Sequence, residues 1–322
     1  MIRRCLRRAV SALLLLGAAA AQAQDYPSAP IRIVVPYAAG GIADVLARLV
    51  AVRLEPMWKQ SVVVENRAGA NGTIAMQFVA QVRPDGHTLM IGNTATQVVN
   101  RFLYRNLAFD IERGFQPVGL IATTPMMLVV AASSPANSVA DLLAMARAEP
   151  GRLNFGSAGN GSSSHLGLAM LTSLGKVQIA HVPYKGTAQI VPDLLGGRLA
   201  GYFDVPGTSL GAIRAGTLKP LGVGSSKRLA ALPNVPTMAE TLPGFELYSW
   251  LGLFAPAGVP RERIDRLNRA LRGMLEEPSL NRQLVEQGNE VAPNTPEEFD
   301  AFIRREAVRM GELLAAAGVR PE

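Results

Sequence analysis

Residues 31–54 read IRIVVPYAAGGIADVLARLVAVRL, and this stretch decides the fold class. It starts with an apolar, β-branched run of strand length over 31–37, and the pair Gly40-Gly41 then interrupts the strand pattern. From Ile42 the apolar spacing is helical, and we expect Val45, Leu49 and Val52 to share one face of a helix over 42–54. A strand, a glycine turn and a helix in this order are typical of a parallel α/β sheet.

The same theme recurs along the chain. It predicts further strands over 61–65, 88–92, 126–131, 153–156, 178–182, 201–205 and 218–224, and helices over 138–148, 163–174 and 188–195. Beyond residue 260 the pattern predicts helices only, over 261–275, 279–287 and 295–317. Thr295 is the expected N-cap of the last helix, because Pro296 and two glutamates follow it.

A helical tail after α/β units usually packs back on the first of them. We therefore expect an α/β fold with two lobes, one made of residues 24–124 and 225–322 and the other of residues 125–224. The chain would cross between the lobes near residues 123–127 and again near 222–226, where Pro, Gly and Ser concentrate.

Composition supports a globular protein of about two domains, since the 322 residues are 48% hydrophobic and 18% charged. Residues 1–23 combine arginines, an apolar run and Ala21-Gln22-Ala23, which predicts a signal peptide cleaved after Ala23 and export to the periplasm. Cleavage would remove Cys5, the single cysteine, so disulfides, thiolate metal sites and a cysteine nucleophile are excluded from the mature chain. It would also remove four of the arginines behind the net charge of +7, which leaves little support for nucleic-acid binding.

A second glycine turn, residues 154–161 (NFGSAGNG), repeats the order of strand end, turn and helix start found at Gly40-Gly41. Such turns expose backbone N–H groups at the positive end of a helix dipole and favour a carboxylate, phosphate or sulfate. Two of them, one from each lobe, would face each other across a cleft. The alternative is that the glycines only permit tight turns.

Catalytic and metal motifs are weak in this sequence. Gly207-Thr-Ser209-Leu-Gly211 matches a nucleophile elbow, but all three histidines, His87, His165 and His181, precede Ser209, whereas an α/β-hydrolase needs one after it. Ser163 beside His165 is the other serine candidate, although neighbours on a new helix do not align for proton transfer. We expect no enzyme activity, no metal site and no cofactor; a secreted serine hydrolase using Ser209 or Ser163 and an interaction module without a small ligand stay as alternatives.

Seven short motifs follow one another over nearly the whole mature chain: residues 36–44 (PYAAGGIAD), 64–72 (VENRAGANG), 83–89 (RPDGHTL), 156–166 (GSAGNGSSSHL), 182–186 (VPYKG), 193–197 (DLLGG) and 255–258 (APAG). In this order they resemble the Bug-type periplasmic receptors, the solute-binding family of tripartite tricarboxylate transporters. The resemblance implies a two-lobed, type II Venus flytrap fold without catalysis. It also implies a small carboxylate or amino-acid ligand, and a membrane permease of the tripartite type or a sensor as partner; we expect a monomer.

Carried over by residue, the resemblance places ligand contacts on loops of both lobes. In the first lobe they are Tyr37, Ala38, Gly40, Gly41 and Asp44, with Asn93 and Thr94; in the second they are Ser157, Asn160, Ser162 and Ser163, flanked by Tyr184 and Asp204. The backbone N–H groups of residues 38–41 would bind one carboxylate, and the second-lobe side chains would hold another polar group.

Four other residues have more than one interpretation. Arg67 could clamp a carboxylate, but a structural ion pair is favoured because it lies among turn residues. Asp204 could accept a hydrogen bond from the ligand or cap the helix near Thr208. His165 is expected to pack or cap locally, and Trp250 to belong to the core or the hinge.

Overall fold

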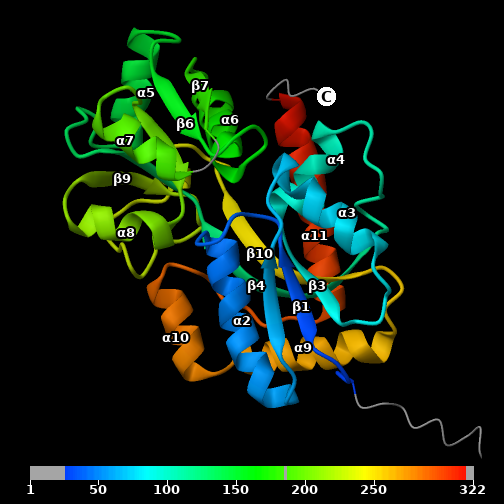
Figure 1. Cartoon of the computed structure of the whole chain (residues 1–322). Helices are drawn as coiled ribbons and strands as arrows, with labels where there is room; N and C mark the ends of the chain where they lie inside the picture. The colour runs from blue at the N-terminus through cyan, green and yellow to red at the C-terminus, as the bar shows by residue number, and fades with distance from the viewer. Residues whose placement is uncertain (1–25, 185–186, 317–322) are drawn as a thin grey trace, which may run out of the picture.

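The protein forms two mixed sheets, each flanked by helices, in a computed structural model that describes residues 26–184 and 187–316 (Figure 1). We call the part built on the first sheet the first lobe and the part built on the second sheet the second lobe. The predicted signal peptide, residues 1–23, lies outside the described residues.

The first lobe has a five-stranded sheet in the order β2-β1-β3-β10-β4. Strand β1 pairs in parallel with β2 and β3, whereas β10 runs antiparallel to both β3 and β4. Its strands are β1 (Ile31–Val35), β2 (Val62–Asn66), β3 (Thr88–Asn93), β4 (Phe115–Pro125) and β10 (Tyr248–Pro256). Its helices are α2 (Ile42–Trp58), α3 (Thr73–Gln81) and α4 (Asn100–Leu103), the last continuing a π-helical turn, η2 (Ala95–Val99).

The second lobe repeats this plan with a sheet in the order β7-β6-β8-β5-β9. Strands β6, β7 and β8 are parallel, and β5 is antiparallel to β8 and β9. Its strands are β5 (Met127–Ala131), β6 (Asn154–Ser157), β7 (Ala180–Pro183), β8 (Gly201–Asp204) and β9 (Leu218–Val223). Its helices are α5 (Val139–Ala148), α6 (Ser163–Gly175), α7 (Ile190–Leu195) and α8 (Pro206–Arg214).

The chain passes between the sheets at two neighbouring points. Met126 alone separates β4 from β5, whereas the return from β9 to β10 takes residues 224–247. These residues stay beside the second sheet, since Thr237 bridges Val223 and the Phe245 ring stacks on Phe203. The Met126 N–H donates to the Leu247 carbonyl (3.0 Å), the Gly224 N–H donates to the Met126 carbonyl (2.6 Å), and the Leu247 N–H donates to the Gly224 carbonyl (2.9 Å). The two crossing segments are therefore bound to each other through their backbones.

Helices α9 (Arg261–Leu275), α10 (Pro278–Glu286) and α11 (Pro296–Ala316) complete the chain. Helices α9 and α11 pack on β4, so this helical segment covers the first lobe, as predicted. Thr295 is confirmed as a capping residue, because the Glu298 N–H donates to its hydroxyl (3.2 Å) while the Glu298 carboxylate accepts from the Thr295 N–H (2.8 Å). Trp250 is fully buried against Phe299 and Phe302, which confirms its place in the core.

Each predicted strand forms to within about two residues at each end, a usual margin for element boundaries. The predicted apolar face of the first helix is wrong: Val45 and Val52 are 47% and 67% exposed, and the buried face of α2 carries Leu46, Val50 and Leu54. Apolar residues occur on both the buried and the exposed face of α2, so the helical period alone does not tell which face packs on the sheet. The face with Ala43, Ala47 and Ala51 allows α2 to lie close to the sheet.

No helix among the described residues is long and apolar enough to cross a bilayer.

Gly252 in β10 lies against the Phe299 ring of α11, so a larger residue here tests how closely this helix packs on the sheet. A Cβ at this position would overlap the Phe299 ring, which is buried against Trp250. We expect Gly252→Ala to lower the free energy of unfolding in urea by about 1–3 kcal/mol through overpacking. Gly273→Ala in α9 is the control, because a Cβ there meets nothing within 4 Å and alanine favours a helix. Equal effects from the two variants would contradict the packing argument.

Candidate functional site

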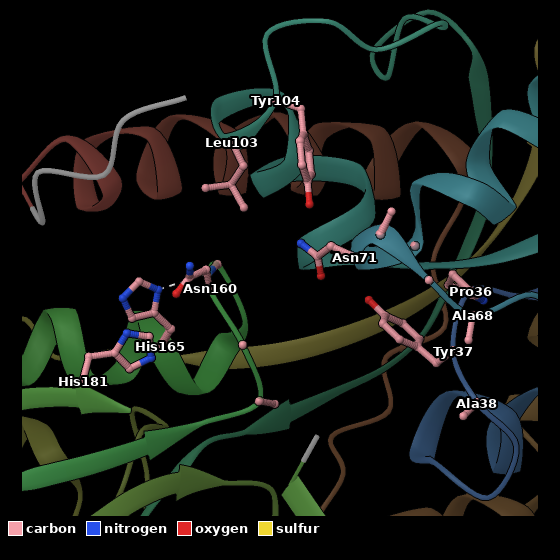
Figure 2. Close-up of a pocket in the computed structure, with 16 residues that line it drawn as sticks. Pro36, Tyr37, Ala38, Ala68, Asn71, Leu103, Tyr104, Asn160, His165 and His181 are labelled. Carbon is pink, nitrogen blue, oxygen red and sulfur yellow. Dashed lines mark hydrogen bonds between the residues drawn. The ribbon is translucent and has the colours of Figure 1, made fainter. Parts of the chain in front are cut away.

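A cavity of about 830 Å³ lies between the two lobes. Figure 2 shows Tyr37, Asn71 and Tyr104 on the side of the first lobe and Asn160, His165 and His181 on the side of the second. The described residues that line it carry no carboxylate, ammonium or guanidinium group; they are Pro36, Tyr37, Ala38, Ala68, Gly69, Ala70, Asn71, Gly72, Leu103, Tyr104, Ala158, Gly159, Asn160, Gly161, His165 and His181. Specific recognition in this cavity therefore depends on backbone groups, amides, phenols and imidazoles.

The turn from β1 to α2 leaves backbone donors open. The Gly40 N–H is used, because it donates to the Asp44 Oδ2 atom at 2.9 Å, and Gly40 takes a left-handed φ of +86° to do so. No hydrogen bond within the described residues uses the N–H groups of Ala38, Ala39 or Gly41. These donors lie at the positive end of a 17-residue helix, which suits a carboxylate.

Asp44 shapes this turn and does not line the cavity. Its carboxylate is 4% exposed and pairs with Arg48, whose Nη2 atom lies 3.0 Å from Oδ1. The hydrogen bond from Arg48 keeps the pKa of the Asp44 carboxyl below its usual value, and the Gly40 N–H acts in the same direction. Asp44 thus holds the turn while Arg48 neutralises its charge.

The side-chain amide of Asn93 holds Tyr37 in place. Its hydroxyl accepts from Asn93 Nδ2 at 2.8 Å, while Asn93 Oδ1 accepts from the Thr96 N–H at 3.0 Å. Burial raises the pKa of Tyr37 to about 12, so the phenol is neutral at pH 7. Asn93 therefore positions Tyr37 from outside the cavity lining. Thr94 is 2% exposed, and its hydroxyl has no hydrogen-bond partner within the described residues.

Residues 68–72 form a wall that the site prediction omits. Gly69, Ala70, Asn71 and Gly72 all have positive φ values, and Asn71 donates through Nδ2 to Asn100 Oδ1 at 2.7 Å. The buried Asn100 amide donates in turn to the Asn71 carbonyl at 3.0 Å. Gly and Asn tolerate left-handed backbone, so the letters Gly-Ala-Asn-Gly are the sequence signal for this turn.

The turn from β6 to α6 differs from the first turn, because its own chain uses its donors. The N–H groups of Ala158, Gly159 and Gly161 donate to Ser164 Oγ (2.9 Å), Ser157 Oγ (3.2 Å) and His165 Nδ1 (3.0 Å). The Ser162 hydroxyl donates to the Gly159 carbonyl (2.7 Å) and caps α6, and Ser163 is the first residue of that helix. Of the four predicted second-lobe loop residues, Asn160 lines the cavity, whereas Ser157, Ser162 and Ser163 do not.

Two histidines stack in the second-lobe wall. The rings of His165 and His181 lie 4.1 Å apart at an angle of 11°, and His181 Nε2 is 2.5 Å from Ser157 Oγ. Burial lowers both pKa values, and the neighbouring His181 contributes to bringing the pKa of His165 to about 4. Both imidazoles are therefore neutral at pH 7. The expected local cap by His165 is confirmed by its bond from Gly161, whereas the sequence analysis gives His181 no binding role.

The two flanking residues lie outside the cavity lining. The Tyr184 hydroxyl donates to Asp193 Oδ2 at 2.6 Å. Asp204 is 3% exposed and accepts from Tyr202 (2.9 Å), Thr208 (2.6 Å) and Ser209. The predicted cap is wrong, because Val205 is the N-cap of α8 and, within the described residues, Asp204 accepts from the side chains of Thr208 and Ser209 and from no backbone N–H of this helix.

Arg67 and Ser209 have structural partners. The Arg67 guanidinium pairs with Glu65 at 2.6 Å and lies 3.6 Å from the centroid of the Phe78 ring, so the predicted ion pair is confirmed. Ser209 lies inside α8, is 1% exposed and donates to Asp204, with no histidine among its partners. Within residues 26–184 and 187–316, no group of three or more His, Cys, Asp or Glu side chains could hold a metal.

Two α/β lobes joined by crossing segments, with a polar cavity between loops at their strand ends, define a two-lobed solute-binding protein. A family model described as tripartite tricarboxylate transporter family receptor matches residues 46–319. The chain belongs to this family of solute-binding receptors, which confirms the resemblance of its seven motifs.

Solved structures agree with this assignment. The chain is 37% identical to R. palustris Rpa4515 with adipate, covering 92% of this chain and all of that one, with a TM-score of 0.87. It is 34% identical to the periplasmic binding protein BugD, with a TM-score of 0.83 and coverage of 92% and 100%. It is 31% identical to MatC (Rpa3494) from Rhodopseudomonas palustris with bound malate, with a TM-score of 0.81 and coverage of 90% and 100%. The predicted two-lobed fold is confirmed.

The histidine stack makes stability depend on pH in the ligand-free protein. An unfolded histidine titrates near pH 6.5, whereas His165 titrates at about 4, so the unfolded chain binds more protons between these values. We expect the free energy of unfolding to fall as the pH drops from about 6.5 towards 4, and His165→Gln to flatten this fall. NMR titration of the ring protons provides the measurement; a midpoint for His165 at or above 6.5 would contradict the neutral stack.

Proposed function

We propose that this protein captures a small carboxylate between its lobes in the periplasm and delivers it to the membrane permease of a tripartite transporter or to a sensor. The observation that carries the proposal is the set of open N–H groups at the start of α2, on Ala38, which lines the cavity, and on its neighbours Ala39 and Gly41; the described residues that line the cavity carry no carboxylate, ammonium or guanidinium group. A carboxylate bound there meets oriented donors and no competing anion, since Arg48 neutralises Asp44.

The size of the cavity and the similar proteins support a small organic acid. About 830 Å³ lies within the usual range for small-molecule sites. Two of the similar structures hold adipate and malate, both of which are dicarboxylates. We infer that the ligand here is of the same class, with an amino acid as the alternative, because the Asn71 side-chain carbonyl could accept from an amine.

The predicted contact residues divide into two groups in this proposal. Tyr37, Ala38, Gly41 and Asn160 contact the ligand, directly or through water. Of the others, Gly40 and Asp44 shape the first-lobe turn, Asn93 positions Tyr37, and Ser157 and Ser162 bind backbone groups of the second-lobe turn. Thr94, Ser163, Tyr184 and Asp204 do not line the cavity, and no ligand contact is proposed for them. Closure brings the second sheet, with residues 225–246 packed on it, towards the first lobe, and the crossings at Met126 and Leu247 serve as the hinge.

The proposal includes no catalysis. Solute binding is the activity of the family, and the partners of Ser209 are those of a helix residue with a structural role. Ser209→Ala is expected to leave carboxylate binding unchanged; a turnover that this variant loses would support the hydrolase instead. The remaining alternative, an interaction module, requires that no small molecule binds.

A thermal-shift screen tests the proposal directly. A ligand that binds only the folded state adds about 2.7 kcal/mol of stability at 100 times its dissociation constant. We expect Tm to rise with one class among mono-, di- and tricarboxylates and amino acids, measured on the mature chain. A screen in which none of these compounds raises Tm would favour the interaction module.

Gly41 allows the first-lobe donors to be tested one at a time. Its φ of −77° suits proline, and Gly41→Pro removes the open N–H, whereas Gly41→Ala keeps it and meets only the Ala38 carbonyl at 3.8 Å. A hydrogen bond to a charged group is worth about 1.5–3 kcal/mol, so we expect Gly41→Pro to weaken carboxylate binding by roughly 10–100-fold in calorimetry. Equal affinities for the two variants would show that the anion binds elsewhere.

A further inference from the structure

The cavity has one feature that the proposed function does not use. A dicarboxylate that places one end on the first-lobe turn must place its other end near the second-lobe wall. Among the described residues, no lysine or arginine lines that wall, and a buried carboxylate without a partner is costly. Of the described lining side chains, those of His165 and His181 can take up a proton to become cations.

The hydrogen bonds distinguish the two imidazoles. His165 Nδ1 accepts from the Gly161 N–H at 3.0 Å, so neutral His165 carries its proton on Nε2, and a second proton would have to displace this bond. His165 is thereby held neutral by the backbone of the adjoining loop.

His181 has no such restriction, because its partner is a hydroxyl. Ser157 Oγ lies 2.5 Å from His181 Nε2 and 3.2 Å from the Gly159 carbonyl. When His181 is neutral, Ser157 can donate to Nε2; when His181 is protonated, Ser157 can accept from Nε2–H and turn its own proton to the Gly159 carbonyl. The site can thus hold His181 in either state without losing the bond to Ser157.

We propose that His181 binds the second carboxylate of a dicarboxylate ligand and that each such carboxylate is bound together with one proton taken from solution. This rests on the proposed function, and it assigns the second-lobe half of the same site. The proton goes onto the imidazole nitrogen that is vacant in the neutral ring, and the carboxylate accepts from the resulting imidazolium.

Among the described residues, the surroundings of His181 contain few other ionisable groups. Strand β6 contributes Ser157, α6 contributes His165, and residues 158–161 between them contribute no ionisable side chain. Beyond β7, Tyr184 is bound to Asp193, which pairs with Arg198. Across the cavity the first lobe presents the phenols of Tyr37 and Tyr104. Burial lowers the pKa of His181, with no charged neighbour among the causes, so the ring is neutral before the ligand arrives.

The protonation of His181 on binding determines how affinity depends on pH. A bound carboxylate raises the pKa of His181 relative to the free protein, so binding takes up a proton in the interval between the two values. Affinity for a dicarboxylate rises as the pH falls through this interval, by at most about tenfold per pH unit for one linked proton. A monocarboxylate of the same length has no second charge to pair with His181 and shows no such dependence.

Calorimetry with adipate and hexanoate tests the proposal on the mature chain. Aliphatic carboxyl groups titrate below about pH 6, so between about pH 6 and 8 both ligands are largely ionised. We expect adipate binding to take up a measurable fraction of a proton, at most one, determined from its binding enthalpy in two buffers of different ionisation enthalpy. We also expect its affinity to rise roughly threefold or more from pH 8 to pH 6, within the limit for one linked proton, and hexanoate to show neither effect.

Two histidine variants test whether His181 is the group that takes up the proton. His181→Gln keeps a hydrogen-bonding group beside Ser157 and should abolish the proton uptake with adipate, whereas hexanoate should take up no proton in either the wild type or the variant. His87→Gln is the control, because His87 packs against Tyr26 outside the cavity lining and should leave uptake as in the wild type.

Three outcomes would overturn the proposal. Binding of adipate without proton uptake would show that His181 stays neutral in the complex; this outcome would contradict the present proposal and leave the proposed function intact. Uptake that persists in His181→Gln would assign the proton to another group. A protein that binds none of the carboxylates in the thermal-shift screen would contradict the proposed function as well.

Discussion

The backbone bonds among Met126, Gly224 and Leu247 are the constraint on which the arrangement of the lobes depends. A single residue separates the strands of the two sheets on the outward crossing, and the return crossing is bonded to it at 2.6–3.0 Å. A Cβ at Gly224 would lie 2.6 Å from the Leu247 carbonyl oxygen, so glycine is needed for this approach. The return crossing spans residues 224–247 before β10, and these bonds tie both of its ends to the one-residue outward crossing.

The two glycine turns look alike in sequence and differ in chemistry. In the first, an aspartate uses one N–H and leaves its neighbours open; in the second, serine and histidine side chains take the N–H groups of Ala158, Gly159 and Gly161. Polar side chains that satisfy their own loop make a rigid wall with few free donors. A ligand therefore finds backbone donors on one side and side-chain amide and imidazole groups on the other.

Local patterns explain which parts of this structure can be predicted. Strands such as β1 and the capped start of α11 depend on neighbouring residues, and the sequence predicts them well. Strands β4 and β10 are not predicted, because Pro117, Gly119 and Gly252 interrupt their apolar residues and weaken the strand pattern. The two strands nevertheless pair with each other along most of their length. In the site, Asn71 and His181 depend on Asn100 and Ser157, which are 29 and 24 residues away, and no local spacing reveals such pairs.

At the cavity, the second-lobe turn contacts the first lobe through Gly161, which has no side chain to bury. Gly161, with a φ of +72°, lies so close to Leu103 that a Cβ would overlap it, and Val99 is 3.0 Å from the same position. The approach is possible because the residue has no side chain, and for the same reason it buries little apolar area. Apolar packing between the lobes is made away from the cavity, where α11 packs on α6. At the cavity itself, a ligand that binds groups on both walls gains more from the closed state than from the open one, and this difference shifts the population.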